Sequence, residues 1–173
     1  DAQKRVVGEC TKDMQSGRPM SRLIQGDVGS GKTVVAAALC FNAAKNGYQS
    51  ALMAPTEILA EQHYKTFSGI VENTDIKCGL LTGSLTKKQK SDIKTQLKNG
   101  EIDVIIGTHA LIVNDVEFQN LGLVITDEQH RFGVAQRGKL TEKGNNPHTL
   151  VMSATPIPQT LAYILYGDLD ISI

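Results

Sequence analysis

A glycine-rich octapeptide, Gly26-Asp27-Val28-Gly29-Ser30-Gly31-Lys32-Thr33, follows a short apolar run and opens an alanine-rich stretch. It matches the GxxxxGK[ST] pattern, in which glycines let backbone N–H groups turn inward around an anion. A helix that begins directly after such a loop adds its positive N-terminal dipole. The Lys32 ammonium can then reach the β- and γ-phosphates of a nucleotide, and the Thr33 hydroxyl can bind Mg²⁺. The strand–loop–helix context favours this site for Mg·ATP over a chance glycine-rich turn.

An acidic pair, Asp127-Glu128, directly follows the apolar run Leu121–Thr126. An aspartate at the tip of a buried strand can hold Mg²⁺ or its water, and the adjacent glutamate can orient and deprotonate an attacking water. Taken alone, such a pair is more typical of a solvent-facing turn. The phosphate-binding pattern upstream makes nucleotide hydrolysis the stronger interpretation.

Small polar residues follow three other apolar runs. Ser153-Ala154-Thr155 comes after Leu150–Met152, where hydroxyls could link the γ-phosphate site to a partner domain. Ala54-Pro55-Thr56 and Gly107-Thr108-His109 carry groups suited to a nucleic-acid backbone. Taken singly, each segment is more typical of a turn and a helix cap.

The elements that must position these residues alternate along the chain. Predicted strands are Leu23–Gln25, Ala51–Ala54, Lys77–Leu81, Val104–Gly107, Leu123–Thr126 and Leu150–Met152, and predicted helices are Lys32–Asn46, Glu57–Val71 and Lys87–Asn99. Most of the strands are apolar without alternation, as strands buried on both faces are. Thr56 is a plausible N-cap, Thr86 and Gln89 form a capping box, and Gly47 and Gly100 can end helices. The pattern predicts an α/β fold with a mainly parallel sheet, helices on both faces and ligands at the carboxyl ends of the strands.

Composition sets broader limits. The 173 residues fit one domain; 40% are hydrophobic and 21% charged, and 18 basic residues balance 18 acidic ones. No net field draws the domain to a polyanion, so nucleic acid would be bound by groups placed on one face. The three widely spaced cysteines favour reduced, buried thiols over a metal site. No apolar run approaches the roughly 20 residues that span a bilayer, and no signal peptide is evident, so we expect a cytoplasmic protein without a membrane partner.

Six blocks, taken in order, resemble the RecG-type DNA helicases of superfamily 2, and specifically their first RecA-like motor lobe. They are RLIQGDVGSGKT (22–33), ALMAPTEILAEQHY (51–64), LLTGS (80–84), IGTHAL (106–111), DEQHRFGVAQR (127–137) and SATPIPQTLA (153–162). DEQH followed by RFG also fits transcription-repair coupling translocases, which stay open as the alternative. MAPTEILAEQHY favours the RecG type. A P-loop ATPase unrelated to nucleic acid is the third possibility.

The resemblance implies a RecA-like P-loop domain over residues 1–173 that uses ATP and Mg²⁺ and, in a complete protein, drives translocation on DNA and remodelling of forks and junctions. Asp127 and Glu128 would manage the metal and the attacking water, and Gln3 would read the adenine edge. A further set would couple the phosphate state to DNA: Gln129, His130, Ser153 and Thr155. Another set would line the track of one DNA strand: Pro55, Thr56, Thr82, Gly83, Thr108 and His109.

The chain begins inside a helical pattern and ends in a strand-like run, Leu169–Ile173, which suggests a fragment of a longer protein. The family's second motor lobe, with its arginine finger, and its wedge domain lie outside these residues. We therefore expect this chain to bind nucleotide but turn it over slowly.

Two further groups of residues have ordinary explanations. Five lysines, at positions 87, 88, 90, 94 and 98, are predicted to form a solvated helix face rather than an added DNA contact. His63 and His148 have no acidic partner at ligand spacing, so they are predicted to be ordinary surface or core histidines.

Overall fold

The computed structural model describes residues 2–26, 31–127, 134–153 and 170–172. Their seven strands form one sheet in the order β3-β4-β2-β5-β6-β1-β7, and every hydrogen-bonded pair in it is parallel. The strands are β1 (Ser21–Gln25), β2 (Gln49–Met53), β3 (Cys78–Leu81), β4 (Val104–Gly107), β5 (Leu121–Asp127), β6 (His148–Ser153) and β7 (Asp170–Ser172). The helices are α1 (Ala2–Gln15), α2 (Lys32–Lys45), α3 (Glu57–Val71), α4 (Lys87–Lys98), the 3₁₀ turn η1 (His109–Ile112) and α5 (Val134–Thr141). The predicted α/β class and parallel sheet are confirmed.

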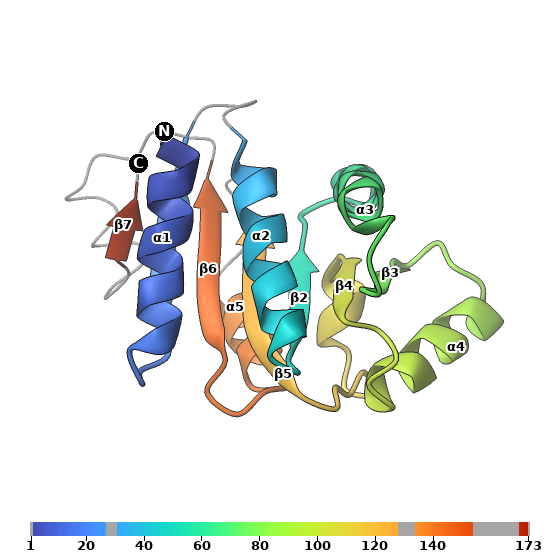
Figure 1. The fold of residues 1–173 in the computed structure, drawn as a ribbon. Coiled ribbons are helices and arrows are strands. Elements are labelled where there is room, and N and C mark those ends of the chain that lie inside the picture. Colours follow the sequence, from blue (N-terminus) through green and yellow to red (C-terminus); the bar gives the residue numbers. More distant parts are fainter. Residues whose placement is uncertain (1, 27–30, 128–133, 154–169, 173) are drawn as a thin grey trace.

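Helices cover both faces of the sheet (Figure 1). Helices α1, α2 and α3 pack on one face, where their apolar side chains meet Leu52, Ile106 and Ile125. Helices α4 and α5 pack on the other face against Ala51 and Ile105. Because successive strand residues point to opposite faces, each central strand contributes to both cores. This explains why β2 and β4 are buried throughout and why their sequences show no alternation.

The helix boundaries follow local signals in the sequence. The Thr56 hydroxyl accepts a hydrogen bond from the Leu59 N–H at 3.2 Å. Thr86 and Gln89 form the predicted capping box, with bonds of 2.9 and 3.1 Å. Such a cap stabilises a helix by about 1 kcal/mol. Gly47 and Gly100, with φ of +84° and +76°, follow the ends of α2 and α4. Both helices stop one residue before the predicted end because an asparagine forms the cap.

A buried glutamine forms three hydrogen bonds at the amino-terminal ends of the strands. Gln49 is 4% exposed at the start of β2. Its Nε2 donates to the backbone oxygens of Leu97 and Ile102 at 3.0 and 2.9 Å, and its Oε1 accepts from the Asn120 N–H at 2.9 Å. These bonds satisfy a side chain that would be costly to bury unpaired, and they fix the end of α4 beside the start of β5.

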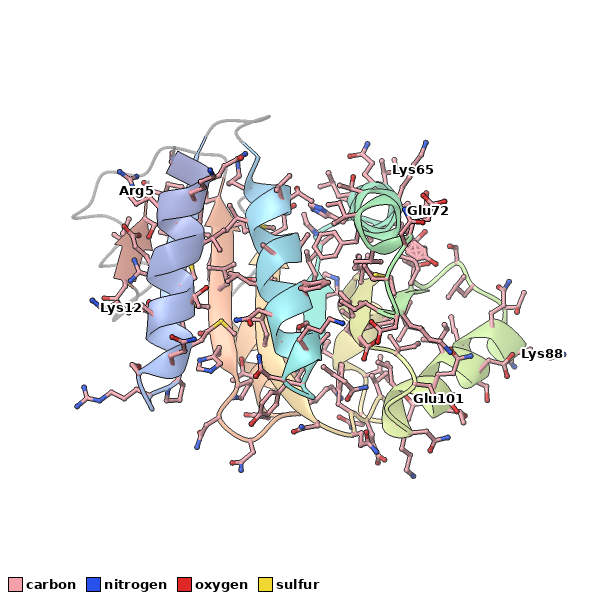
Figure 2. The ribbon with its side chains drawn as sticks, in the orientation of Figure 1. Arg5, Lys12, Lys65, Glu72, Lys88 and Glu101 are labelled. Atoms are coloured by element: carbon pink, nitrogen blue, oxygen red, sulfur yellow. The ribbon has the colours of Figure 1, made fainter. Side chains whose placement is uncertain are left out.

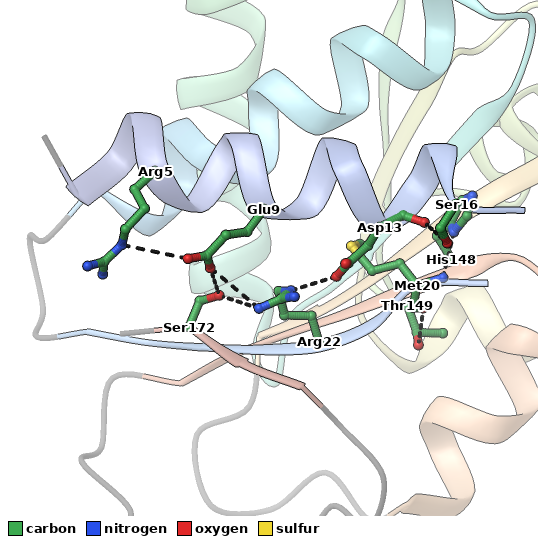
Figure 3. Close-up of polar contacts among 9 residues, drawn as sticks. All are labelled: Arg5, Glu9, Asp13, Ser16, Met20, Arg22, His148, Thr149 and Ser172. Carbon is green, nitrogen blue, oxygen red and sulfur yellow. Dashed lines mark hydrogen bonds and ion pairs between the residues drawn. The ribbon is translucent and has the colours of Figure 1, made fainter. Parts of the chain in front are cut away.

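Arg22 fastens α1 to the sheet (Figure 3). From β1, its guanidinium donates to Asp13 Oδ2 at 2.7 Å, to Glu9 Oε2 at 3.4 Å and to Ser172 Oγ at 2.7 Å. Ser172 belongs to the edge strand β7 and donates in turn to Glu9. Arg5 forms a longer, exposed pair with Glu9 at 3.8 Å. The cluster thereby joins α1, β1 and β7.

A second contact ties the turn after α1 to β6. The Met20 N–H donates to His148 Nδ1 at 2.7 Å, and burial lowers the pKa of this histidine. His148 is thus a half-buried structural histidine, as predicted.

The three cysteines are free thiols in α1, α2 and β3. Burial raises the pKa of Cys10 and Cys78 to about 11 and that of Cys40 to about 12. The thiols are therefore protonated at neutral pH. Cys10 and Cys40 are buried, as predicted, whereas Cys78 is only partly buried. No helix in the described part of the chain combines the length and apolarity needed to cross a bilayer.

Candidate active site

Three strand ends form the core of the site: those of β1, β6 and β5, which are neighbours in the sheet. The Gly26 N–H donates to the Ser153 backbone oxygen at 3.2 Å, so the phosphate loop starts directly beside the end of β6. Asp127 ends β5 and pairs in register with Met152. With strands spaced about 4.8 Å apart, the ends of β1 and β5 lie about 10 Å from each other. A nucleotide phosphate with its metal can span that gap.

The start of α2 presents donors to this gap. Gly31 is its N-cap, has φ of +83° and has no side chain that could cap the helix. The start of α2 therefore differs from those of α3 and α4, which threonine side chains cap, and a helix start of this kind favours an anion. Lys32 Nζ donates to the Gly26 backbone oxygen at 2.7 Å, which places the ammonium beside the end of β1. Thr33 is half-buried in the same turn.

Gln3 lies against this loop although it comes from α1. A Cβ added at Gly31 would lie 1.8 Å from the Gln3 side-chain nitrogen. The positive φ of Gly31 favours glycine at this position, and an added Cβ would also displace the end of the Gln3 side chain. The fold thus brings together two residues that the sequence assigned separately to nucleotide binding.

Asp127 has a protein partner that the sequence did not predict. His63 Nε2, on α3, lies 2.7 Å from Asp127 Oδ2, and the two side chains are 11% and 14% exposed. His63 was predicted to be an ordinary surface or core histidine, and the structure adds an acidic partner that this prediction did not include. Sequence spacing gave no signal of this pair, because the two residues are 64 positions apart and meet only through the packing of α3 on the sheet.

The donor set suits a metal that arrives with its nucleotide. The described residues contain no cluster of three or more His, Cys, Asp or Glu side chains that could hold an ion. Mg²⁺ is usually bound through one or two protein ligands plus phosphate oxygens and waters. The Asp127 carboxylate and the Thr33 hydroxyl fit that pattern, so ATP would supply the remaining ligands.

The predicted DNA-facing residues lie at the carboxyl ends of three other strands of the same sheet. They follow β2, β4 and β3, which are also neighbours in the sheet. Thr56, Gly83 and His109 are exposed there, whereas Pro55 is half-buried. Two of the set are buried: Thr82 is 1% exposed and Thr108 is 8% exposed. We call the segment ends that carry these six residues, after β2, β3 and β4, the ledge. The two buried threonines lie inside it, and its exposed residues form its surface.

Hydrogen bonds link the loops of this ledge. The Thr82 and Ser84 hydroxyls lie 3.2 Å apart, and the Ser84 N–H donates to Glu57 Oε1 at 3.1 Å. Glu57 is the first residue of α3. The loop after β3 and the start of α3 are therefore joined by a hydrogen bond.

The lysines of α4 are partly neutralised. Lys94 pairs with Asp115 at 2.8 Å and Lys98 pairs with Glu117 at 3.4 Å, along a surface hollow of about 480 Å³. Lys88 projects from the outer end of the helix into solvent (Figure 2). These features favour the predicted solvated face.

The remaining predicted site residues lie outside the described residues. They are Asp27, Val28, Gly29, Ser30, Glu128, Gln129, His130 and Thr155. Their roles stay predictions.

Comparisons with known proteins agree with this geometry. The sequence matches the DEAD/DEAH box helicase family over residues 1–164. The ATP-dependent DNA helicases RecG of Aquifex aeolicus and Bacillus subtilis are 58% and 54% identical over 99% and 100% of this chain. The chain spans 22% and 25% of their lengths.

Solved structures show the same fold. The structure of RecG bound to a three-way DNA junction superposes with a TM-score of 0.86 at 54% identity, covering 98% of this chain and 23% of that one. The helicase MrfA superposes with a TM-score of 0.75 at 17% identity over all of this chain and 29% of that one, which shows the fold alone. With its phosphate loop, its β5 aspartate and a family match over residues 1–164, the chain belongs to the DEAD/DEAH box helicases.

Proposed function

We propose that this chain is the ATP-binding motor lobe of a RecG-type DNA helicase that remodels replication forks and Holliday junctions in recombination and repair. The observation that carries the proposal is the division of one sheet edge into two halves. The ends of β1 and β6 meet at Gly26, where the phosphate loop starts, and β5 lies on the other side of β6; the ends of β2, β4 and β3 form a separate ledge. The identity of 54–58% to proteins named RecG supports the RecG type over a coupling translocase.

In this proposal, the backbone amides of residues 26–31 and the start of α2 hold the ATP phosphates, while Lys32 neutralises the β- and γ-phosphates. Gln3 faces the adenine edge. Thr33 and Asp127 hold Mg²⁺, which would offset phosphate charge when bound. Glu128 orients the attacking water and takes its proton.

The link to DNA follows from the neighbouring strand ends. The Ser153 backbone oxygen accepts a hydrogen bond from the Gly26 N–H, so a shift of the phosphate loop would also move the end of β6. Thr155, Gln129 and His130 would extend that link to the second lobe. Thr56 and the exposed loops beside it would contact one DNA strand through its phosphates, independently of base sequence.

A second RecA-like lobe of the same protein would complete the site with an arginine. Such a residue contributes on the order of 10³–10⁵ in rate in other P-loop enzymes. This chain alone should therefore bind Mg·ATP and hydrolyse it slowly. We place the full-length protein, with its DNA substrate, in the cytoplasm of a bacterial cell.

Glu128→Gln in the full-length protein tests the proposed chemistry. The variant should bind Mg·ATP as tightly as the wild type, because glutamine keeps the shape and loses only the base. Its DNA-stimulated ATPase should fall at least about 100-fold, the lower range of general-base contributions. Glu142→Gln, an exposed carboxylate after α5, is the matched control. Normal turnover by Glu128→Gln would assign the base to another residue.

A further inference from the structure

We propose that His63 is a positioning residue for Asp127, and that it fastens α3, the helix that starts at the DNA-facing ledge, to the nucleotide site. The inference rests on the proposed magnesium role of Asp127. It adds a protein partner to that carboxylate and a physical link between the two halves of the sheet edge.

The contact has the geometry of an orienting hydrogen bond. His63 Nε2 and Asp127 Oδ2 lie 2.7 Å apart, within hydrogen-bond distance. In the proposed role Asp127 accepts this bond as a metal-holding carboxylate, so His63 donates from Nε2. Both side chains are less than 15% exposed, with values of 11% and 14%, so water competes little for the bond. Holding Oδ2 fixes the rotation of the carboxylate and leaves Oδ1 as its other acceptor.

The position of His63 on α3 makes the bond stiff. Ala60 and Phe67 are 0% and 1% exposed, and with His63 they follow an i, i+3, i+7 pattern that marks one helix face. Lys65 and Glu72 lie on the opposite, outer side of the helix (Figure 2). His63 therefore sits in the stripe that packs on the sheet, and α3 cannot move without moving the donor.

The N-terminal end of α3 lies at the ledge. Thr56, its exposed N-cap, follows β2, and Glu57 binds the loop after β3 through the Ser84 N–H. A DNA strand that displaces this end displaces the same rigid helix that holds Asp127. DNA binding and the orientation of the metal-holding carboxylate are coupled through one helix and one hydrogen bond.

Two substitutions of His63 separate the hydrogen bond from simple filling of space. His63→Gln keeps an N–H at a similar reach, and His63→Leu keeps volume but removes the donor. Gln62→Leu, on the exposed side of the same turn, is the matched control. Each variant is made in the full-length protein, and binding of a fluorescent ATP analogue is measured with and without Mg²⁺, alongside the melting temperature.

The bond predicts a metal-specific effect. His63→Leu should reduce the Mg²⁺-dependent gain in nucleotide affinity by about 10–100-fold, the usual cost of losing a partner of a metal ligand. Affinity without Mg²⁺ should stay unchanged, and His63→Gln should recover most of the gain. The ratio of DNA-stimulated to basal ATPase should also fall in His63→Leu and not in Gln62→Leu. Equal Mg²⁺ dependence in His63→Leu and wild type would overturn the inference, as would an equal loss in His63→Gln.

A double-mutant cycle with Asp127→Asn separates this inference from the proposed function. Once Asp127 is replaced, His63→Leu should cause no further loss, because the two residues act through one bond. Full additivity would show that His63 acts independently and would refute the positioning role alone. Unchanged Mg·ATP binding by Asp127→Asn itself would remove Asp127 from the metal site and overturn both proposals. If His63→Leu does not fold, His63→Ala, which also removes the donor, takes its place in the binding assay and in the cycle with Asp127→Asn.

Discussion

Replacing Arg22 by methionine should loosen α1 from the sheet, because Asp13 loses its cation and Glu9 keeps only Arg5 and Ser172 as partners. Methionine keeps the apolar stem of arginine and removes the guanidinium. Asp13 and Glu9 would then face each other on α1 without their shared cation, and Ser172 of β7 would lose its donor.

The expected size follows from exposure. The Arg22 and Asp13 side chains are 12% and 27% exposed, so their 2.7 Å bond should contribute about 1.5–3 kcal/mol, as hydrogen bonds to charged groups do. Glu9 is 38% exposed and lies farther away, at 3.4 Å, so solvent screening limits its pair to about 0.2–1 kcal/mol. Together, the loss should be about 2–4 kcal/mol, or about 5–12 °C in melting temperature for a chain of this size.

Arg5→Met is the matched control, because Arg5 shares the Glu9 partner. Its pair is longer, at 3.8 Å, and its side chain is 59% exposed, so its loss should cost less than about 0.5 kcal/mol, as for an exposed i,i+4 pair. Urea denaturation gives both free energies, and amide hydrogen exchange in α1 should rise only in Arg22→Met. Equal small losses in the two variants would refute the role of Arg22 as the clamp.

Three other predictions use matched features of the chain. Burial lowers the pKa of His148, so the folded state binds the proton less tightly than the unfolded chain. The neutral imidazole therefore contributes folding stability above the unfolded pKa near 6.5, and this contribution is lost as the pH falls below that value. His148→Asn, which keeps an acceptor for the Met20 N–H, should flatten the dependence of urea-denaturation free energy on pH between 7 and 5, and an unchanged slope would exclude His148 as its source. Gly107→Ala would place a Cβ 2.2 Å from a backbone oxygen of β3 and should cost about 1–3 kcal/mol, whereas Gly69→Ala, with open space on α3, should stabilise by up to about 1 kcal/mol; equal signs in thermal melts would contradict this. Gln3→Ala should reduce the preference for ATP over GTP in competition binding without changing the affinity for inorganic triphosphate, and an unchanged preference would remove Gln3 from base recognition.

Local chemistry made part of the structure predictable. The strand and the helix on either side of the glycine-rich motif were predictable, and in the structure β1 ends at Gln25 and α2 begins at Lys32. Thr56 and Thr86 marked helix starts, and Gly47 and Gly100 marked helix ends, because a cap depends on residues only a few positions apart. Apolar runs without alternation predicted the parallel sheet, because strands that helices cover on both faces carry apolar side chains on both faces.

Contacts across the fold were not predictable in this way. The bond of His63 to Asp127, the three hydrogen bonds of Gln49 and the bond of Arg22 to Ser172 each join residues far apart in the sequence. The packing of the whole sheet decides which helix lies over which strand, and the spacing of residues in the sequence does not indicate this packing. The burial of Thr82 was hidden for the same reason, since a threonine after a strand suits an exposed turn equally well.

Binding of ATP at the loop before α2 is the central claim, and calorimetric titration of this chain with ATP in the presence of Mg²⁺ tests it most directly. One molecule should bind per chain, and Lys32→Ala should bind at least about 10-fold more weakly, since losing a charged hydrogen bond costs about 1.5–3 kcal/mol. Absence of binding by the folded wild-type chain, or equal affinity in Lys32→Ala, would contradict the claim.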